Sequence, residues 1–495
     1  MRVVFRADAS LEIGTGHVVR CLTLADALRE RGCECIFVSR ELPGALLDAV
    51  RQRGHACVAL PRSEAVDWRA DALATRGAIG ARADWLVVDH YALDAAWQRE
   101  LRGSCTRLMV IDDLADREHD CELLLDQNLV AAFEQRYDGK VPAGCGLMLG
   151  PAYALLQPAY AELHSKVAVR RGPIERALVY FGGADPENLT EQTIEAFLAV
   201  DAGVEVDVVI NAADPRAEAI RHRTAGHPRI TLHASLPSLA PLMARADVAV
   251  GAGGATTWER CCLGLPSVVV TLADNQKPIA AELAKRGLIE WLGHGDEVGV
   301  AELTAAIRAL LAEGANEQRS RRVRELVDGR GAERVSAIML LDSQTALRAR
   351  AARSSDEELI LAWANDALVR RHAFKPDPIP AAEHRVWFGN RLNEADACRL
   401  YVIETAEALP IGQVRFQRDG DYWEIHYSLD ARARGRGLAR PLLATALEAL
   451  RSTAPEAVVF GRVKAANVAS ARVFEGLGFT AHAESHGIIL YTRPI

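Results

Sequence analysis

The first 340 residues alternate short apolar runs, rich in β-branched residues, with longer amphipathic stretches. This alternation predicts strand–helix units, because short apolar runs suit buried strands and longer periodic stretches suit helices. The first series of predicted strands is RVVFRA, CECIFV, ACVAL, WLVVDH, RLMVIDD, ELLLDQ and GLMLG. A second series begins near Glu175 and comprises ERALVYFGG, VEVDVVIN, RITLHA, ADVAVGAGG and PSVVVTLA. Two consecutive series predict two doubly wound parallel domains in tandem.

The pattern changes after about Ser343, where the apolar runs become the antiparallel-type strands CRLYVIE, IGQVRFQ and DYWEIHYSL. This segment predicts a separate α+β domain. The expected organisation is therefore a Rossmann-like domain over 1–168, a second Rossmann-like domain over 172–340 and an α+β domain over 344–495. Ligands of doubly wound sheets bind at the carboxyl ends of strands, so the cleft between the first two domains is the expected site.

The length, charge and composition of the chain exclude several classes of function. At 495 residues the chain is too long for one core. Its net charge of −8 gives no footprint for nucleic acid or an anionic membrane, and no apolar run reaches transmembrane length. The ten scattered cysteines form no CxxC pair and predict buried free thiols, and MRVVFRAD begins as a strand without a signal peptide. We expect a cytoplasmic protein with small-molecule substrates, no nucleic-acid or membrane partner, and no metal.

Glycine marks three strand-to-helix turns, at IGTGH (13–17), FGGADPENLT (181–190) and GAGGATTWERC (251–261). Glycine lets the backbone approach a ligand, and the helix start beyond it offers free N–H groups to an anion. None of these turns matches a P-loop or the GxGxxG fingerprint, and any one of them alone is explained equally well by packing. Several together favour a nucleotide or sugar-nucleotide cleft.

His17 lies in the first turn of a predicted helix, HVVRCLTLADALRERG, which is expected to end at Gly32. The positive end of the helix dipole disfavours a protonated imidazole, and a neutral imidazole is what a general base requires. From the residues alone, a partly buried packing role is an equal alternative.

These motifs, in order, resemble a known family. RADASLEIGTGHVVRCLTLADAL, VVDHY, IDDLADR, LGPAYALL, FGGADP and GAGGATTWERCCLGLPS resemble the UDP-2,4-diacetamido-2,4,6-trideoxy-β-L-altropyranose hydrolases of pseudaminic acid biosynthesis, over about residues 1–340. The resemblance implies a GT-B fold, metal independence, and His17 as the base that activates water, with UDP leaving. It also implies diphosphate at the GAGGATTWE turn and ribose at Glu259, and leaves Gln157, where arginine is expected, without a role. The candidate substrate contacts are Gly14, Gly16, Tyr91, Gly253, Gly254, Thr256, Thr257, Glu259 and Asn275.

The C-terminal segment has its own motif, a strand running into the turn Arg432–Gly437 and then a helix. Such a turn presents consecutive N–H groups to a pyrophosphate. With VKAANVASARVFEGLGF downstream, residues 344–495 resemble the GCN5-related N-acetyltransferases (GNAT), and the resemblance implies acetyl-CoA as co-substrate. The candidate cofactor contacts are Arg432, Arg434, Gly435, Arg436, Gly437, Leu438, Ala439 and Asn467.

One position departs from that family, because Phe474 stands where many members have a tyrosine that protonates the leaving thiolate. The acid must then be another group, such as Tyr427, or solvent. Glu424 and His426 are candidate bases, although either could be an ordinary sheet-surface residue. The WAND…EHRVWF pattern more weakly resembles the sugar-nucleotide 4-amino acetyltransferases of the same pathway.

The leading hypothesis is a fusion of two consecutive steps: acetylation of the 4-amine of a UDP-amino sugar, then hydrolysis of UDP from the diacetamido product. A GT-B glycosyltransferase tethered to an acetyltransferase of another amine is the alternative. A binding module that holds a UDP-sugar without turnover, and acetylates a protein amine, is a third possibility.

Overall fold

The computed structural model describes residues 1–10, 12–63, 67–183, 185–200, 203–212, 214–234, 236–394, 396–482 and 485–495. Leu11 and Ala184, which belong to two of the motifs above, lie outside these ranges. The chain divides into two compact units, Met1–Val141 with Met148–Ser336, and Pro142–Leu147 with Ala337–Ile495. No helix in the described ranges is long and apolar enough to cross a membrane.

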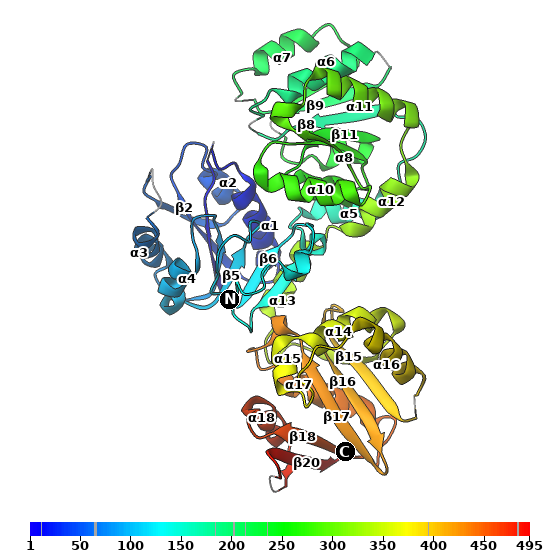
Figure 1. Ribbon diagram of the computed structural model, residues 1–495. Helices are drawn as coiled ribbons and strands as arrows, with labels where there is room; N and C mark the ends of the chain where they lie inside the picture. Colours follow the sequence, from blue (N-terminus) through cyan, green and yellow to red (C-terminus); the bar gives the residue numbers. More distant parts are fainter. Residues whose placement is uncertain are drawn as a thin grey trace. The chain divides into compact units, whose positions relative to one another are not determined.

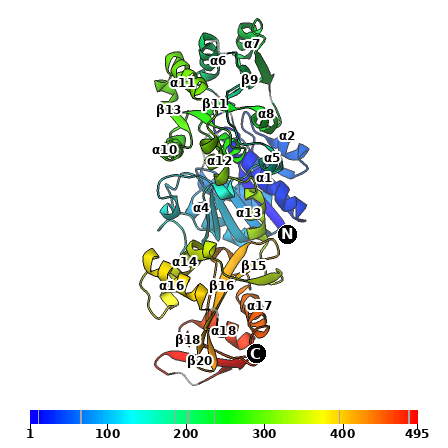
Figure 2. The same cartoon turned by 90° about the vertical axis from the view of Figure 1, so that its right-hand side faces the viewer.

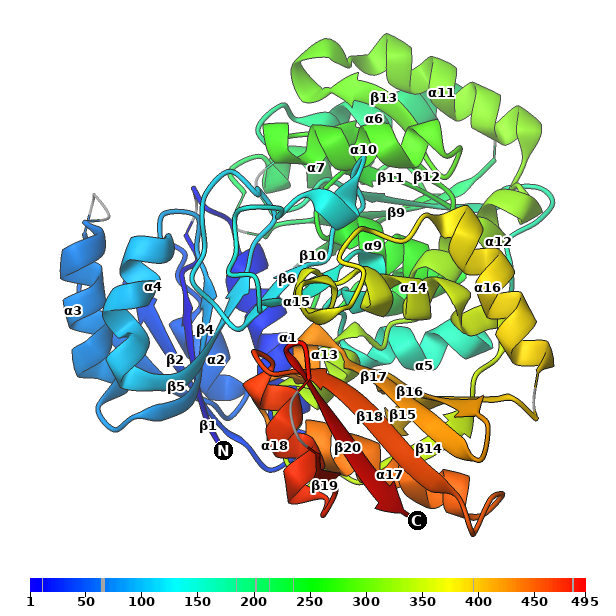
Figure 3. The ribbon, with the colours of Figure 1, turned by 60° about the horizontal axis from the view of Figure 1, so that its bottom comes forward.

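The first unit contains a seven-stranded sheet in the order β3-β2-β1-β4-β5-β6-β7 (Figure 1). Its strands are β1 (Arg2–Ala7), β2 (Glu34–Arg40), β3 (Ala56–Leu60), β4 (Ala83–Asp89), β5 (Cys105–Ile111), β6 (Leu123–Asp126) and β7 (Gly146–Leu149). The helices that connect them are α1 (Gly16–Glu30), α2 (Leu47–Gln52), α3 (Trp68–Ile79) and α4 (Ala95–Leu101). In Figures 1 and 3, α1 and α2 lie on one side of this sheet and α3 and α4 on the other. The central strands β1 and β4 are therefore buried on both faces, which explains their continuous apolar sequences.

A second sheet of the same unit has the order β10-β9-β8-β11-β12-β13, with every neighbouring pair parallel. Its strands are β8 (Arg176–Tyr180), β9 (Glu205–Ile210), β10 (Ile230–Ala234), β11 (Val248–Ala252), β12 (Ser267–Thr271) and β13 (Glu290–His294). The helices that follow β7 are α5 (Pro158–Lys166), α6 (Leu189–Val200), α7 (Ala217–Thr224), α8 (Ala240–Arg245), α9 (Thr256–Cys262), α10 (Lys277–Lys285), α11 (Val300–Glu313), α12 (Glu317–Leu326) and α13 (Gly331–Leu340). Both sheets have the doubly wound order that the strand pattern predicted. Successive strands are added to one side of β1 and β8 and then to the other, and ligands bind at such switch points.

The second unit contains a seven-stranded sheet in the order β14-β15-β16-β17-β18-β20-β19. Its strands are β14 (Leu347–Ala351), β15 (Cys398–Thr405), β16 (Pro410–Asp419), β17 (Tyr422–Leu429), β18 (Val458–Lys464), β19 (Thr480–Ala481) and β20 (Ile488–Pro494). Its helices are α14 (Glu357–Asn365), α15 (Ala367–His372), α16 (Ala381–Asn393), α17 (Ala439–Arg451) and α18 (Val468–Gly476). Figure 2 shows α14 and α16 on one face of the sheet and α17 on the other.

Each of the three predicted regions thus contains one sheet, while the exact boundaries at 168, 172, 340 and 344 stay a prediction. The prediction of buried thiols is confirmed, since all ten cysteines are free and all but Cys57 are buried. Five strands were not among those predicted: β13, β14, β18, β19 and β20. Of these, LRARA forms β14. Its arginines alternate with apolar residues, and Arg348 and Arg350 both bind Glu404 on the neighbouring strand β15.

Candidate active sites

The first site begins at the loop between β1 and α1. Gly14 takes a φ of +82° and its N–H bonds to the carbonyl of Ser10 at 2.9 Å, so the loop closes on itself before the helix starts. Helix α1 then begins at Gly16 and places His17 in its first turn, 5% exposed. Gly32 has a φ of +83°, and α1 ends two residues before it, as predicted. The loop therefore delivers a buried histidine to the carboxyl edge of the sheet.

His17 is paired with a buried carboxylate. Its Nδ1 lies 2.5 Å from Oδ1 of Asp89, the last residue of β4, which has no exposed surface. Ala7 and Asp89 face each other in the β1–β4 register, so the sheet brings the two loops together. Arg20, one helical turn after His17, donates from Nε and Nη2 to both oxygens of Asp89 at 2.6 Å. Burial would raise the pKa of Asp89, but the charge of Arg20 and the bonds from Arg20 and His17 outweigh it and hold that pKa well below its usual range.

An ionised Asp89 fixes the tautomer of His17. A carboxylate only accepts hydrogen bonds, so Nδ1 must carry a proton, and in the neutral ring Nε2 keeps its lone pair. Within the described ranges no hydrogen-bond partner is found for Nε2. The pair has the geometry of a general base held in orientation by a carboxylate.

Two further predicted residues join this histidine. The Tyr91 ring meets the His17 ring edge-on, with centroids 4.5 Å apart. Its hydroxyl lies 3.4 Å from Nδ2 of Asn275, which follows β12 in the other sheet of the same unit. The structure therefore brings His17, Tyr91 and Asn275 together, although they are far apart in sequence.

The glycine turn between β11 and α9 holds the next group of predicted residues. A Cβ added to Gly253 would lie 3.2 Å from the Thr271 side chain, and one added to Gly254 would lie 3.6 Å from Gln276. Thr256 begins α9, while Thr257 is buried and its hydroxyl accepts from Arg260 at 3.1 Å. Glu259 is hydrogen-bonded to Tyr160, and burial raises its pKa. The ligand-binding roles of these residues, and of Gly14 and Gly16, stay predictions.

Sequence reasoning did not single out Asp89, Arg20 or Arg260. Arg20 could have been found from its spacing, because residues three apart on a helix share a face. Asp89 could have been found as the polar end of the strand expected beside β1 at the switch point. Nothing in TTWERCC distinguishes Arg260 from a solvent-exposed helix residue, yet it is 3% exposed.

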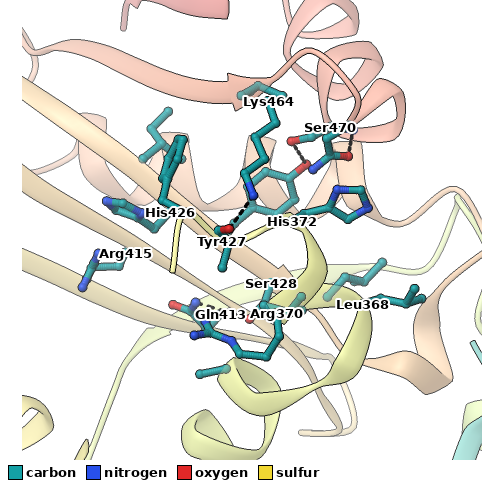
Figure 4. Close-up of a pocket in the computed structure, with 18 of the residues that line it drawn as sticks. Leu368, Arg370, His372, Gln413, Arg415, His426, Tyr427, Ser428, Lys464 and Ser470 are labelled. Carbon is teal, nitrogen blue, oxygen red and sulfur yellow. Dashed lines mark hydrogen bonds between the residues drawn. The ribbon is translucent and has the colours of Figure 1, made fainter. Parts of the chain in front are cut away.

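The second site is a cavity of about 990 Å³ in the C-terminal unit (Figure 4). It opens where β17 and β18 separate. These parallel strands pair with each other only from Tyr422 to Glu424 on β17. Beyond that point, among the described strands, Ile425–Leu429 pairs only with β16 and Arg462–Lys464 only with β20, and both segments line the cavity. Helices α14 to α16 cover its other side. Splayed strands of this kind expose backbone and side chains to a ligand.

Basic side chains outnumber acidic ones in the described lining of this cavity. Six basic side chains line it, and Glu383 is the one acidic residue among its described lining; the six are Arg370, Lys375, Arg415, Arg434, Arg462 and Lys464. Arg415 stacks over Trp387 at 5.2 Å, and burial lowers its pKa. Within the described ranges no carboxylate lies within 4.0 Å of Arg415. The cavity therefore suits an anionic ligand.

Of the two candidate bases, only His426 lines the cavity. Its Nε2 lies 3.3 Å from Oε2 of Glu424, and Arg462 holds the other oxygen of Glu424 at 2.6 Å. The bond from His426 and the charge of Arg462 overcome burial and lower the pKa of Glu424 to about 2. A carboxylate with so low a pKa is a weak base, so the geometry favours His426 as the base and Glu424 as the residue that positions it.

Tyr427 and Asn467 both lie at the cavity. The Tyr427 hydroxyl is 2.9 Å from Oγ of Ser470, and burial raises its pKa, against the effect of that hydrogen bond. Phe474 is 2% exposed and packs between Tyr427, Phe479 and Tyr491. Asn467 caps α18, since its side chain accepts from the N–H of Ser470. The Tyr427 phenol therefore lies beside Phe474, the side chain that has no hydroxyl group to donate.

In the turn before α17, the arginine side chains are already engaged within the protein. Arg432 binds Asp430 at 2.7 Å, Arg434 binds Asp366 at 2.8 Å, and Arg436 is buried against the carbonyls of Met339 and Leu341. The N–H groups of Gly437, Leu438 and Ala439 find no acceptor in the part of the chain that the structure describes. The side chains therefore shape the turn, and backbone amides are the groups left for a phosphate.

No group of three or more His, Cys, Asp and Glu side chains in the described ranges could hold a metal ion. Metal independence of the chemistry stays a prediction.

Comparison with known proteins agrees with both architectures. Residues 346–480 match the family model described as "Acetyltransferase (GNAT) domain". The C-terminal unit carries a GNAT acetyltransferase domain. This confirms the expected α+β domain and its relation to the N-acetyltransferases.

The N-terminal part is similar to two curated proteins. "Spore coat polysaccharide biosynthesis protein SpsG" of Bacillus subtilis is 25% identical over 351 residues, which is 68% of this chain and 98% of that protein. "UDP-2,4-diacetamido-2,4,6-trideoxy-beta-L-altropyranose hydrolase" of Campylobacter jejuni is 23% identical over 288 residues, 58% of this chain and 97% of that protein. The resemblance found in the motifs is thereby confirmed.

Among solved structures, MurG of Acinetobacter baumannii aligns with a TM-score of 0.50 and 12% identity, over 68% of this chain and 99% of MurG. At this identity the likeness concerns the fold alone. The N-terminal unit is a GT-B-like pair of Rossmann-type domains, and the GNAT domain follows it.

Proposed function

We propose that the chain is a bifunctional sugar-nucleotide enzyme. Its N-terminal unit hydrolyses UDP-2,4-diacetamido-2,4,6-trideoxy-β-L-altropyranose to UDP and the free sugar. Its GNAT domain uses acetyl-CoA to acetylate the 4-amine of the preceding UDP-amino sugar, as in pseudaminic acid biosynthesis. The observation that carries the hydrolase assignment is the His17–Asp89 pair, an oriented base at the switch point of a GT-B-like fold.

In the hydrolase reaction, Nε2 of His17 takes a proton from water while the water oxygen bonds to the anomeric carbon. The bond from that carbon to the β-phosphate oxygen breaks, and UDP leaves with the electron pair. Diphosphate is already a good leaving group, so the protein must supply an oriented nucleophile and positive dipoles. In this proposal Tyr91 and Asn275 contact the sugar, the Gly253–Thr257 turn binds the diphosphate, and Glu259 binds the ribose.

The charge of the GNAT cavity supports an anionic acceptor. Four of the six basic residues, Arg370, Lys375, Arg415 and Lys464, form no ion pair within the described ranges. These charges would repel a polyamine or a basic peptide and attract an amino sugar that carries a diphosphate. The same charges suit the phosphates of acetyl-CoA, which the backbone amides of Gly437 to Ala439 would bind.

In the acetyl transfer, the amine nitrogen attacks the acetyl carbonyl and the carbon–sulfur bond breaks. His426, positioned by Glu424, accepts the amine proton, and Tyr427 gives its phenolic proton to the departing thiolate. Burial keeps Tyr427 protonated at neutral pH, as an acid must be.

One experiment tests both halves on the full chain. UDP-diacetamido sugar is supplied in H₂¹⁸O without any acceptor, and UDP-4-amino sugar is supplied separately with acetyl-CoA. We expect UDP release with ¹⁸O on the anomeric carbon of the sugar, and CoA release only with the amino sugar. His17→Ala should abolish the first reaction and spare the second, and His426→Ala should do the reverse.

UDP release that requires an added sugar or lipid acceptor would instead support a glycosyltransferase. Nucleotide binding without turnover, with acetyl transfer to peptides, would support the binding module. Either result contradicts the proposal.

A further inference from the structure

The β11–α9 turn covers a buried arginine that forms no ion pair with the residues the structure describes. Arg260 is 3% exposed, and within the described ranges no carboxylate oxygen lies within 4.0 Å of it. Its Nη2 donates to the carbonyl of Ala252 at 2.8 Å and to the Thr257 hydroxyl at 3.1 Å, and its Nε finds no partner there. Burial lowers the pKa of Arg260 to about 10, although nearby negative charges act in the opposite direction. The guanidinium therefore stays charged at neutral pH.

Another arginine of the same unit shows what an internally satisfied guanidinium looks like. Arg170 is also buried, and burial lowers its pKa to about 10 as well. Its nitrogens, however, donate to the carbonyls of Met243, Ala244 and Ala246 at 2.8 to 3.2 Å, and to that of Leu263. Buried charges normally have such partners, because an unpaired one is costly. Both guanidinium groups are buried, but Arg260 has fewer hydrogen-bond acceptors around it than Arg170.

The position of Arg260 relates it to the turn above it. Ala252 and Thr257 flank the segment Gly253–Thr256, and the N–H groups of Gly254, Ala255 and Thr256 find no acceptor within the described ranges. A Cβ at Gly251 would clash with the carbonyl oxygen of Tyr180 and lie 3.1 Å from Nη1 of Arg260, so the guanidinium packs closely against β11. Glu259 acts on Arg260 through space, but none of its oxygens lies within 4.0 Å of the guanidinium, and burial raises the pKa of Glu259 itself. A fixed positive charge thus lies directly behind free amide donors.

We propose that Arg260 is the buried counter-charge of the nucleotide diphosphate: it positions the Gly253–Thr256 turn and adds a positive charge that the bound anion balances. Arg260 therefore lowers the stability of the ligand-free protein and raises its affinity for the diphosphate. This inference rests on the proposed function, which places the nucleotide at this turn. It goes further by assigning the charge that holds the diphosphate.

The test measures UDP binding at this turn in the full chain. Hydrogen–deuterium exchange of peptides covering residues 246–270, at increasing UDP concentration, gives an affinity for this site alone, and uridine serves as the phosphate-free probe. For Arg260→Met we expect UDP affinity to fall about 30-fold or more, as for truncation of one partner of a buried charge pair. Uridine affinity should change less than about threefold, and Arg260→Lys should lose less than the methionine variant because it keeps the charge.

The stability of the ligand-free protein distinguishes a diphosphate-binding role of Arg260 from a purely structural role. Without ligand, the slowest-exchanging amides of β11 and β12 in Arg260→Met should be at least as protected as in the wild type, because an unbalanced buried charge is gone. The matched control, Arg170→Met, should lose protection there while its UDP affinity stays within about threefold. The proposal is wrong if Arg260→Met binds UDP normally, or if it loses protection as Arg170→Met does.

If Arg260→Met is too unstable to assay, the proposal is wrong as well, because removing an unbalanced buried charge should not destabilise the ligand-free protein. If UDP protects no peptide of 246–270 in the wild type, the nucleotide site itself has been misplaced. That outcome refutes the proposed function at this turn, and it differs from the failure of Arg260 alone.

Discussion

Both candidate active sites contain a histidine whose ring nitrogen meets a carboxylate that an arginine holds. In the GT-B-like unit these are His17, Asp89 and Arg20, with 2.5 Å between histidine and carboxylate and no exposed surface on Asp89. In the GNAT domain they are His426, Glu424 and Arg462, where the distance is 3.3 Å and the histidine side chain is 35% exposed. The residue types correspond, but the environments differ.

Burial decides what each carboxylate can do. In a water-excluded site a hydrogen bond is electrostatically stronger, so Asp89 fixes the tautomer and direction of His17 with little competition. At the edge of the GNAT cavity, water can replace Glu424 as a partner of His426. We therefore expect the same change, carboxylate to amide, to cost much more in the first site than in the second.

The largest effect is expected at Asp89. Asp89→Asn allows His17 to expose its protonated nitrogen instead of its lone pair, so the rate of UDP release should fall about 10²- to 10³-fold, close to the loss for His17→Ala. Steady-state kinetics with the UDP-diacetamido sugar measure this loss, and acetyl transfer by the same variant should be unchanged.

Asp113→Asn provides a matched control. It removes the other carboxylate that Arg20 binds, at 3.0 Å, without touching His17. A loss under about tenfold is expected. Equal losses in the two variants would mean that Asp89 acts through Arg20 and not as the partner of His17.

A site residue can be predicted from the sequence when its position depends on its neighbours in the chain. It cannot be predicted in this way when its position depends on a contact with a residue far away in the sequence. Buried strands such as RVVFRA and WLVVDH can be predicted from their apolar runs, because central strands of a doubly wound sheet are buried on both faces. His17 is identifiable because its helix start is local. Its pairing with Asp89, 72 residues away, depends on strand register. Nor does the sequence show that Arg462 lies beside Glu424, which is why a carboxylate with a pKa near 2 was a candidate base.

A smaller effect is expected at Glu424. Glu424→Gln should lower kcat for acetyl transfer roughly tenfold, because His426 loses its positioning partner but keeps access to water. His426→Ala should lose more, about 10²-fold. The pKa of Glu424 is lowered to about 2, so the carboxylate stays ionised at any assay pH above about 4. An acidic limb in the rate profile above that pH must belong to another group and should persist in Glu424→Gln. Disappearance of that limb would make Glu424 the base.

The smallest effect is expected at Tyr427, where solvent can substitute for a missing acid. Tyr427→Phe should slow acetyl transfer about fivefold to tenfold while leaving the KM for acetyl-CoA nearly unchanged, since the ring stays in place beside Phe474. Burial raises the pKa of Tyr427, so the wild-type rate should not fall through loss of this proton below about pH 10. Ser470→Ala is the control, because it removes the hydroxyl's partner at 2.9 Å but keeps the phenol. If that variant slows the reaction as much as Tyr427→Phe does, Tyr427 contributes through the hydrogen-bonded pair and not by donating its proton.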